Sequence, residues 1–198
     1  MAALKALAGL GPRGGEGANA VVAARLDDED ERVRSAAVQA LVAVAERGDE
    51  CTVATVSTCL EDADWRVRES ALQALATFAK GSPCAISAVS SRLEHSSDRV
   101  RSAAVDALAV VAKRGDSQAI AAASSRLEHA DPKVRHAALQ ALGKVAMPGD
   151  VRAISAVSGR LEDTNFDVQR SALQALGVLA ERGDQRAVDA VCPFLEHA

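Results

Sequence analysis

Residues 60–75 read Leu-Glu-Asp-Ala-Asp-Trp-Arg-Val-Arg-Glu-Ser-Ala-Leu-Gln-Ala-Leu, and variants of this stretch recur along the chain. Its first leucine belongs to a series of leucines that stand 33 or 34 residues apart: Leu26, Leu60, Leu93, Leu127, Leu161 and Leu195. Self-similarity at a fixed period of about 20–50 residues indicates a repeat array, in which each unit packs on its neighbours. We therefore expect a repeat protein, and an array of this kind is a device for building surfaces.

Each repeat contains two stretches with the periodicity of an amphipathic helix. The first has apolar residues seven, four and zero positions before the marker leucine, as in Ile86, Val89 and Leu93, which places them on one helical face. The second stretch begins after a residue whose side chain suits a helix N-cap, four positions beyond each marker: Asp30, Asp64, Ser97, Asp131 and Asn165. Each repeat is therefore predicted to be a pair of helices.

Gly-Asp pairs mark the junctions between repeats, at residues 48–49, 115–116, 149–150 and 183–184. We expect each glycine to take the left-handed C′ position of the second helix and each aspartate to cap the next helix. The remaining junction, Gly81-Ser82-Pro83, is one residue shorter. It predicts a local change in the stacking angle.

This frame predicts an all-α solenoid that forms a single domain over residues 1–198, with about five full helix pairs and a half unit at each end. The half units are a second helix at residues 2–10 and a first helix at residues 185–197. Terminal repeats usually carry a polar outer face, but both half units keep apolar residues: Leu4, Leu7, Leu10, Val188, Val191 and Leu195. We therefore expect end-to-end self-association or a place in a larger complex.

Composition excludes several classes of function. The formal net charge is −4, so the basic surface of a dedicated nucleic-acid binder is not expected. The apolar runs are shorter than the ~18–20 residues needed to cross a bilayer, so no membrane insertion is expected. The four cysteines show no metal-ligand spacing. They are predicted to be unpaired thiols in a reducing intracellular compartment, either the cytoplasm or an organelle.

The Val-Arg-x-x-Ala-x-x-Ala-Leu core and the Gly-Asp junction, matched across residues 26–184, resemble HEAT repeats. The likeness is to the subtype named for phycobilisome lyases, which is also seen in deoxyhypusine hydroxylase. The resemblance implies a right-handed α-solenoid with the second helices lining the concave face. It also implies that the arginine after each valine holds acids of the turn, a role that falls to Arg34, Arg68, Arg101 and Arg135. Gln169 departs from this pattern, so the fifth unit is expected to be tied least tightly.

The resemblance also tests for catalysis. Relatives of the deoxyhypusine hydroxylase type hold two irons with His-Glu dipeptides repeated on several second helices. Here His136 is followed by Ala137, and the other units have Ser35, Glu69, Ser102 or Arg170 at the histidine position. One histidine cannot assemble a di-iron site, so we expect no metal, no cofactor and no enzymatic activity.

Two other motifs have structural explanations. The pairs Glu94-His95, Glu128-His129 and Glu196-His197 end first helices, where a cation complements the helix dipole, and we expect them to be helix-end residues rather than metal ligands. The tripeptide Arg-Gly-Asp at residues 47–49, 114–116 and 182–184 matches an integrin-binding motif. In this frame it is the last-turn cation, the turn glycine and the next N-cap.

Trp65 and Phe166 follow an N-cap at a position that Glu31, Asp98 and Pro132 fill in other units. The fold therefore does not require an aromatic ring there. Exposed tryptophan is typical of interface anchors, although each ring can equally pack on the neighbouring turn with no partner involved. The sequence leaves both interpretations open.

The function predicted from the sequence is a non-catalytic scaffold that binds a protein or peptide on the concave face formed by the second helices. The alternative is a bilin lyase or a lyase-like subunit, which an apolar concave pocket would favour over a charged, open groove. The predicted contact residues lie in the outward-facing first turns of consecutive second helices: Trp65, Arg66, Glu69, Arg99, Ser102, Lys133, His136, Phe166, Asp167 and Arg170.

Overall fold

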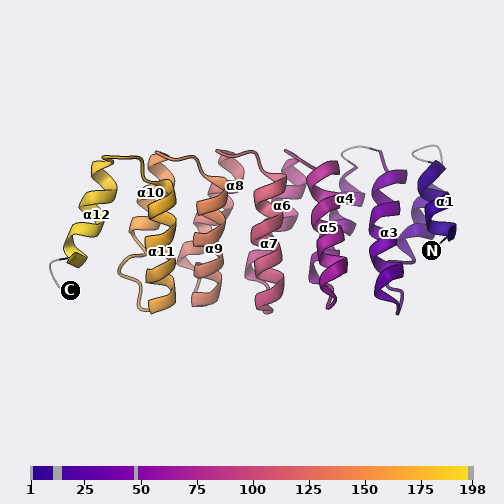
Figure 1. The fold of residues 1–198 in the computed structure, drawn as a ribbon, viewed down its shortest axis with the longest axis horizontal. Coiled ribbons are helices and arrows are strands. Elements are labelled where there is room, and N and C mark those ends of the chain that lie inside the picture. Colours follow the sequence, from indigo (N-terminus) through magenta and orange to yellow (C-terminus); the bar gives the residue numbers. More distant parts are fainter. Residues whose placement is uncertain (1, 11–14, 47–48, 196–198) are drawn as a thin grey trace. The chain divides into compact units, whose positions relative to one another are not determined.

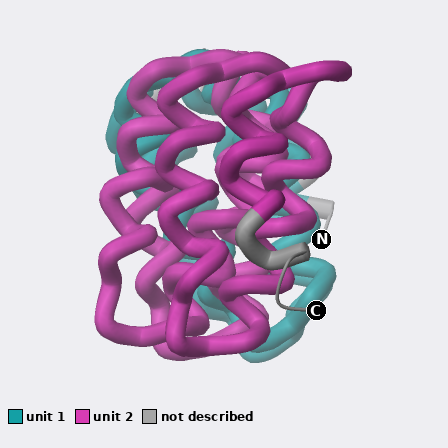
Figure 2. Tube along the Cα trace, turned by 90° about the vertical axis from the view of Figure 1, so that its left-hand side faces the viewer, with its two compact units in different colours: residues 1–89 teal, residues 90–198 magenta. Residues whose placement is uncertain are grey.

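The structure, a computed structural model, describes residues 2–10, 15–46 and 49–195. Over these residues the chain forms α-helices and short 3₁₀ turns without a β-strand, which confirms the predicted all-α solenoid class. The chain divides into two compact units, residues 1–89 and 90–198, and the boundary falls inside a helix (Figure 2). The single domain predicted for residues 1–198 depends on how the two units are placed, and it stays a prediction.

Unit 1 alternates the two kinds of helix in the predicted order. Its elements are α1 (Ala2–Leu10), α2 (Gly15–Ala23), α3 (Glu31–Val44), α4 (Glu50–Thr58), the 3₁₀ turn η2 (Cys59–Glu61), α5 (Trp65–Phe78) and α6 (Pro83–Ser91), which contains the boundary. The second helices α1, α3 and α5 lie side by side, with α3 in contact with both of the others (Figure 1). The first helices α2 and α4 pack against α3 and α5 respectively.

Unit 2 repeats the arrangement. Its elements are η3 (Arg92–Glu94), α7 (Asp98–Val111), α8 (Ser117–Ser124), η4 (Ser125–Glu128), α9 (Pro132–Val145), α10 (Val151–Ser158), α11 (Phe166–Leu179) and α12 (Gln185–Leu195). The second helix α9 packs between α7 and α11 (Figure 1). The first helices α8 and α10 pack on α9 and α11, and α12 contacts α10. The half units at either end of the frame are therefore the helices α1 and α12.

The core consists of small and branched apolar side chains at fixed register positions. One alanine of each second helix from α3 to α11 is completely buried: Ala37, Ala71, Ala104, Ala138 and Ala172. Alanine has no side chain beyond Cβ, so neighbouring helices can approach closely at this point. The marker leucines Leu60, Leu93 and Leu127 are also buried, and each lies in a 3₁₀ turn that ends a first helix.

Most predicted caps are confirmed. Asp30, Asp64, Asp131 and Asn165 each accept a backbone N–H of the following helix. Ser97 occupies the same position before α7, but its hydroxyl makes no capping hydrogen bond. The aspartates of the Gly-Asp junctions cap the first helices, as Asp116 and Asp150 show by accepting two N–H groups each: Gln118, Ala119, Arg152 and Ala153.

The junction glycines Gly115, Gly149 and Gly183 are left-handed as predicted, but they do not occupy C′. Helix α7 ends with Ala112 as its C-cap, three residues before Gly115, whose φ is +83°. The Gly115 N–H donates to the carbonyl of Val145, the last residue of α9, at 2.7 Å. Gly149 bonds in the same way to Leu179, the last residue of α11, at 2.8 Å. The glycine therefore satisfies a free helix-end carbonyl of the next repeat rather than one of its own.

This geometry also explains the Arg-Gly-Asp tripeptide at residues 114–116. Arg114 donates through Nε to the carbonyl of Ala146, Gly115 donates to Val145, and Asp116 caps α8. The N-cap role predicted for Asp116 is confirmed, whereas Arg114 lies beyond the last turn of α7 and Gly115 beyond C′, so the roles predicted for these two residues are wrong. Residues 47–48 of the first copy, and the Glu196-His197 pair, lie outside the described residues.

The predicted change of stacking angle at Gly81-Ser82-Pro83 concerns the placement of the two units and stays a prediction. Among the described residues, no helix is both long and apolar enough to span a bilayer. The four cysteines, all among the described residues, form no disulfide; Cys59 is buried, and Cys51 and Cys192 are exposed. The reducing compartment inferred from them stays a prediction.

Candidate functional site

The first turns of the second helices are positioned by the arginine that follows the valine. Arg135 donates from Nε and Nη2 to both carboxylate oxygens of Asp163, at 2.8 and 2.7 Å, and from Nη1 to the carbonyls of His129 and Ala130. It thereby ties its own turn to the turn of the next repeat. The acid-holding role implied by the resemblance to HEAT repeats is confirmed here.

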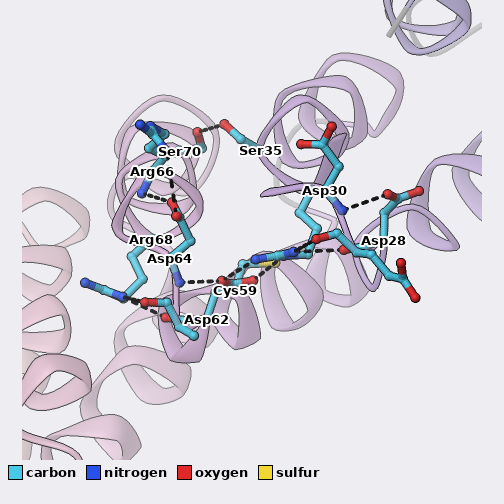
Figure 3. Close-up of polar contacts among 12 residues, drawn as sticks. Asp28, Asp30, Ser35, Cys59, Asp62, Asp64, Arg66, Arg68 and Ser70 are labelled. Carbon is cyan, nitrogen blue, oxygen red and sulfur yellow. Dashed lines mark hydrogen bonds and ion pairs between the residues drawn. The ribbon is translucent and has the colours of Figure 1, made fainter. Parts of the chain in front are cut away.

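Unit 1 contains the equivalent tie. Arg34 donates to both carboxylate oxygens of Asp62, at 2.7 and 3.0 Å, and to the carbonyls of Asp28 and Glu29. Arg68 holds the carbonyls of the turn that contains Asp62 (Figure 3). Arg34 and Arg68 thus tie the first turns of α3 and α5 to the turns beside them.

Arg101 and Gln169 hold their turns less completely. Arg101 is buried and donates to the carbonyls of His95 and Ser96 and to Asp98, an acid of its own helix. Gln169 retains one such contact, from Nε2 to the carbonyl of Asp163 at 2.7 Å. The fifth unit is therefore held by an amide where other units use a guanidinium.

The two paired aspartates have shifted pKa values. The hydrogen bond from Arg135 lowers the pKa of Asp163; burial opposes this, but the N–H of Asn165 and the charges of Arg135 and Arg160 add to the lowering. Burial by itself raises the pKa of Asp62, yet the Arg34 hydrogen bond and the nearby positive charges outweigh burial and lower it. Both carboxylates are therefore stabilised in the ionised form in which they hold the turns.

A groove crosses the first turns of α7, α9 and α11 in unit 2. Its volume is about 490 Å³, and each of the three helices contributes polar side chains. The lining residues include five of the predicted contact residues: Ser102, Lys133, His136, Asp167 and Arg170. These five residues were predicted from the sequence in three successive repeats, and the fold places them around one groove.

The groove is charged and open. Lys133 Nζ lies 3.6 Å from a carboxylate oxygen of Asp98 on the preceding second helix. Arg170 pairs with Asp167 on its own helix at 2.9 Å. All four side chains are exposed, so the charges remain accessible to a partner. The lining therefore offers both signs of charge to a partner.

His136 is joined to α11 through Ser171. The Ser171 hydroxyl lies 2.7 Å from the carbonyl of Asp167 and 2.6 Å from Nδ1 of His136. The hydroxyl of Ser171 thus links the imidazole of His136 on α9 to the backbone of α11.

The unit 1 counterpart of this contact is built from two serines. Ser35 and Ser70 lie at the equivalent positions on α3 and α5, and their hydroxyl oxygens are 2.5 Å apart (Figure 3). The position thus joins adjacent second helices in both units, and only the unit 2 version adds an imidazole.

The other five predicted contact residues do not line the groove. Arg99 and Phe166 are exposed on α7 and α11, with Phe166 72% exposed. Trp65, Arg66 and Glu69 belong to α5 in unit 1 and are exposed there. Trp65 is 61% exposed, and the Arg66 guanidinium lies 5.4 Å from its ring centroid. Both aromatic rings are therefore mostly in solvent, which leaves them available to a partner.

The groove also contains residues that the sequence reasoning missed. Gln140 stands one turn beyond His136 on α9 and is exposed. Its register position carries glutamine in four of the five full units: Gln39, Gln73, Gln140 and Gln174. This recurrence of glutamine in the sequence is the signal from which Gln140 could have been found. The remaining missed lining residues are Asp98, Arg101, Pro132, Ala137 and Asn165.

His95 and His129 lie at helix ends as predicted, as the C-caps of η3 and η4, and each also holds the turn that follows. Nδ1 of His95 accepts the N–H of Ser97, and Nδ1 of His129 accepts the N–H of Asp131, each at 3.0 Å. Asp163 does the same with the N–H of Asn165 at 2.9 Å. At this turn position the imidazoles of His95 and His129 therefore take the acceptor role that the carboxylate of Asp163 has in the next repeat.

The described residues contain no cluster of three or more histidine, cysteine or acidic side chains arranged to hold a metal ion. A larger hollow of about 620 Å³ in unit 1 lies among α2, α3 and α4 and their junction. None of the predicted contact residues lines it. The groove across α7, α9 and α11 is therefore the candidate site.

The chain is similar in fold to several solved repeat proteins. An archaeal HEAT-like repeats protein from Thermococcus onnurineus NA1 is 18% identical, with 98% of this chain and 84% of that chain covered and a TM-score of 0.49. The complex of CpcE and CpcF of phycocyanin lyase from Nostoc sp. PCC7120 is 23% identical, with 98% of this chain and 81% of that chain covered and a TM-score of 0.43. A designed armadillo repeat protein in complex with the peptide (KR)4 is 20% identical, with 90% of this chain and 92% of that chain covered and a TM-score of 0.43.

No match was found among curated proteins. The model of HEAT repeats matches residues 1–76, 42–109 and 86–177, which together cover most of the chain. This agrees with the alternating helices, the buried alanine column and the arginine-held turns. The chain belongs to the HEAT repeat family.

Proposed function

We propose that this protein is a non-catalytic scaffold that binds a protein or peptide across the first turns of α7, α9 and α11. Repeat arrays of stacked helices commonly present extended surfaces to their partners. The observation that carries the proposal is the groove lined by Ser102, Lys133, His136, Asp167 and Arg170 together with Gln140.

The chemistry of the groove suits a polypeptide. Lys133 and Arg170 offer charge-assisted donors to carboxylates or carbonyls, Asp98 and Asp167 accept from cations or amides, and Gln140 offers both a donor and an acceptor. A partner that crosses three helices meets these groups in succession. Because adjacent packed helices are about 8–10 Å apart, the three helices span about 16–20 Å, which a short extended segment covers.

The alternative is a bilin lyase or lyase-like subunit, which would need an apolar pocket for a tetrapyrrole. Charged side chains from all three helices line the groove, and this supports the scaffold. If the scaffold proposal is right, adding a free bilin to the chain leaves the bilin absorption spectrum unchanged. A red-shifted or intensified absorption band would favour the lyase instead.

The scaffold proposal is tested with a displayed library of random peptides selected on the 198-residue chain. We expect peptides with micromolar affinity, and at least tenfold weaker binding to the variants Lys133→Glu and Arg170→Glu. Lys144→Glu is the matched control, because Lys144 is an exposed lysine of α9 that does not line the groove. Peptides that bind all four proteins equally well would place the binding elsewhere.

Trp65 provides a separate readout for unit 1, because it is the single tryptophan of the chain. If a partner also contacts α5, its fluorescence changes on binding and Trp65→Ala costs about 2 kcal/mol of affinity, as buried interface anchors do. Stability changes little, because the ring is mostly exposed. Self-association is a separate proposal that rests on a different face of the chain.

A further inference from the structure

The second helices of unit 2 stack through one recurring contact. A Cβ placed on Gly143 of α9 would lie 3.8 Å from the backbone of Ala175 on α11, at ordinary van der Waals distance. Leu139 lies four residues earlier on the same face of α9 and is completely buried. Helix α11 therefore covers the face of α9 that carries Leu139 and Gly143.

The same face of α11 is open. Leu173 and Gly177 hold the register positions of Leu139 and Gly143, one repeat later. Leu173 is 47% exposed, and a Cβ on Gly177 would have no atom within 4 Å. These residues line a groove of about 380 Å³ that is completed by α12, where Val188 is 46% exposed. The lining is mostly apolar, in contrast to the charged groove on the first turns.

On α1, the position equivalent to Ala175 is exposed. Ala175 and its register equivalents Ala141 on α9 and Ala40 on α3 are buried. Helix α1 packs on α3, and its residue at the same position, Ala6, is exposed. One turn later, a Cβ on Gly9 would also have no atom within 4 Å. Helix α1 thus presents the small-residue face that α11 uses against α9.

We propose that the groove between α11 and α12 binds helix α1 of a second copy of this chain. Ala6 of that copy approaches Gly177 as Ala175 approaches Gly143, and the docked helix covers Leu173 and Val188. The inference continues a contact that the chain already makes between its own repeats, and it does not depend on the proposed scaffold function.

Three features favour α1 over an unrelated helix. The missing Cβ of Gly177 requires a small side chain opposite it for close approach, and Ala6 supplies one. Apart from Lys5, the residues of α1 carry no charged side chain, so the helix offers a mostly apolar surface to the apolar groove. Exposed leucine and valine in one groove are also typical of a surface that a partner covers.

The two faces are different surfaces on each molecule, so the contact is heterologous and head-to-tail. Repetition of such a contact gives stacks that grow with concentration rather than a closed dimer. A variant in either face blocks one side of each molecule and leaves the other side intact. This property makes the proposal testable by mixing.

The experiment measures molar mass by sedimentation velocity over a concentration series of the full chain. We expect the wild-type mass to rise steadily above 20.5 kDa, whereas Leu173→Glu and Ala6→Glu each stay monomeric over at least a tenfold higher concentration range. An equal mixture of the two variants forms dimers and nothing larger, because each supplies the face that the other lacks. Circular dichroism confirms that both variants keep the wild-type helicity.

Val151→Glu is the matched control, because Val151 is about as exposed as Leu173 but lies on α10 outside the groove. It should associate like the wild type. A wild-type chain that stays monomeric throughout, a mixture of the variants that stays monomeric, or association that survives both variants would overturn the proposal. A monomeric wild type would assign the apolar groove to a different protein.

Discussion

Arg135 and Asp163 form a two-point ion pair between successive turns, with N–O distances of 2.8 and 2.7 Å and with both side chains largely buried. The pair joins the first turn of α9 to the turn that precedes α11. The same arginine also holds two carbonyls of its own turn, His129 and Ala130. One guanidinium therefore fixes the position of two neighbouring second helices of the candidate site.

The first prediction concerns the loss of this pair. Replacing Asp163 by alanine leaves the buried Arg135 charge without its carboxylate, so we expect a loss of about 3–5 kcal/mol in the free energy of unfolding. Lys144→Ala removes an exposed pair with Asp106 and should cost at most about 1 kcal/mol. Urea denaturation of the two variants measures the difference, and equal losses would show that burial of the Arg135–Asp163 pair has no energetic consequence.

The second prediction concerns pH. The pKa of Asp163 in the folded chain lies below its unfolded value of about 3.9, so below about pH 4 the unfolded state binds more protons than the folded state. The contribution of the pair to stability is therefore complete above about pH 4 and is lost as the pH falls through the folded pKa. Asp62 behaves in the same direction.

Urea denaturation at pH 7, 4 and 3 checks this. The wild type should lose stability between pH 4 and 3, and Arg135→Gln should lose less over the same interval, because its Asp163 no longer has a depressed pKa from the guanidinium. A variant that loses as much stability as the wild type between these pH values would contradict the assignment.

The third prediction is a gain of stability at His129. This histidine holds the turn position that Asp163 holds in the next repeat, and it lies one repeat beyond Arg101, as Asp163 lies one repeat beyond Arg135. His129→Asp keeps an acceptor for the N–H of Asp131 and places a carboxylate within reach of Arg101. We expect a gain of about 1–2 kcal/mol, typical of a hydrogen bond to a charged group.

His129→Asn is the control for this gain, because its side chain also accepts the N–H of Asp131 but carries no charge. Its stability should stay within about 0.5 kcal/mol of the wild type. Thermal denaturation compares the three proteins. If the asparagine and aspartate variants are equally stable, Arg101 does not use the new carboxylate.

Repeat periodicity predicted most of the fold, because each helix boundary is a local event. An aspartate four residues after a marker leucine caps a helix with its own side chain, as Asp131 does before α9, and the sequence contains that information. The placement of Gly115 was wrong for the opposite reason. Its N–H serves Val145 of the next repeat, a partner 30 residues away that helix-end rules for one chain segment do not include.

Half of the candidate site could be predicted in the same way. Ser102, His136 and Arg170 face one groove because they share a register position on successive second helices, and the sequence frame supplies the register. Phe166 shares a register with Trp65 and also with Asp98 and Pro132, which line the groove, yet the Phe166 ring itself lies outside the lining and is 72% exposed. Side-chain direction depends on packing, which periodicity alone does not describe.

The last prediction compares two glycines with the same backbone. Gly115 and Gly183 both have φ of +83°, so an alanine at either position costs about 1–2 kcal/mol for the left-handed conformation. A Cβ on Gly115 would also lie 2.9 Å from Cγ of Met147, whereas one on Gly183 would have no atom within 4 Å. Gly115→Ala should therefore lose about 1 kcal/mol more than Gly183→Ala, as overpacking does. In a Met147→Ala background the excess should disappear, because the opposing side chain is gone. Urea denaturation of the five variants decides the point: an excess that persists without Met147 would mean that the glycine is needed for the bond to Val145 rather than for the close approach.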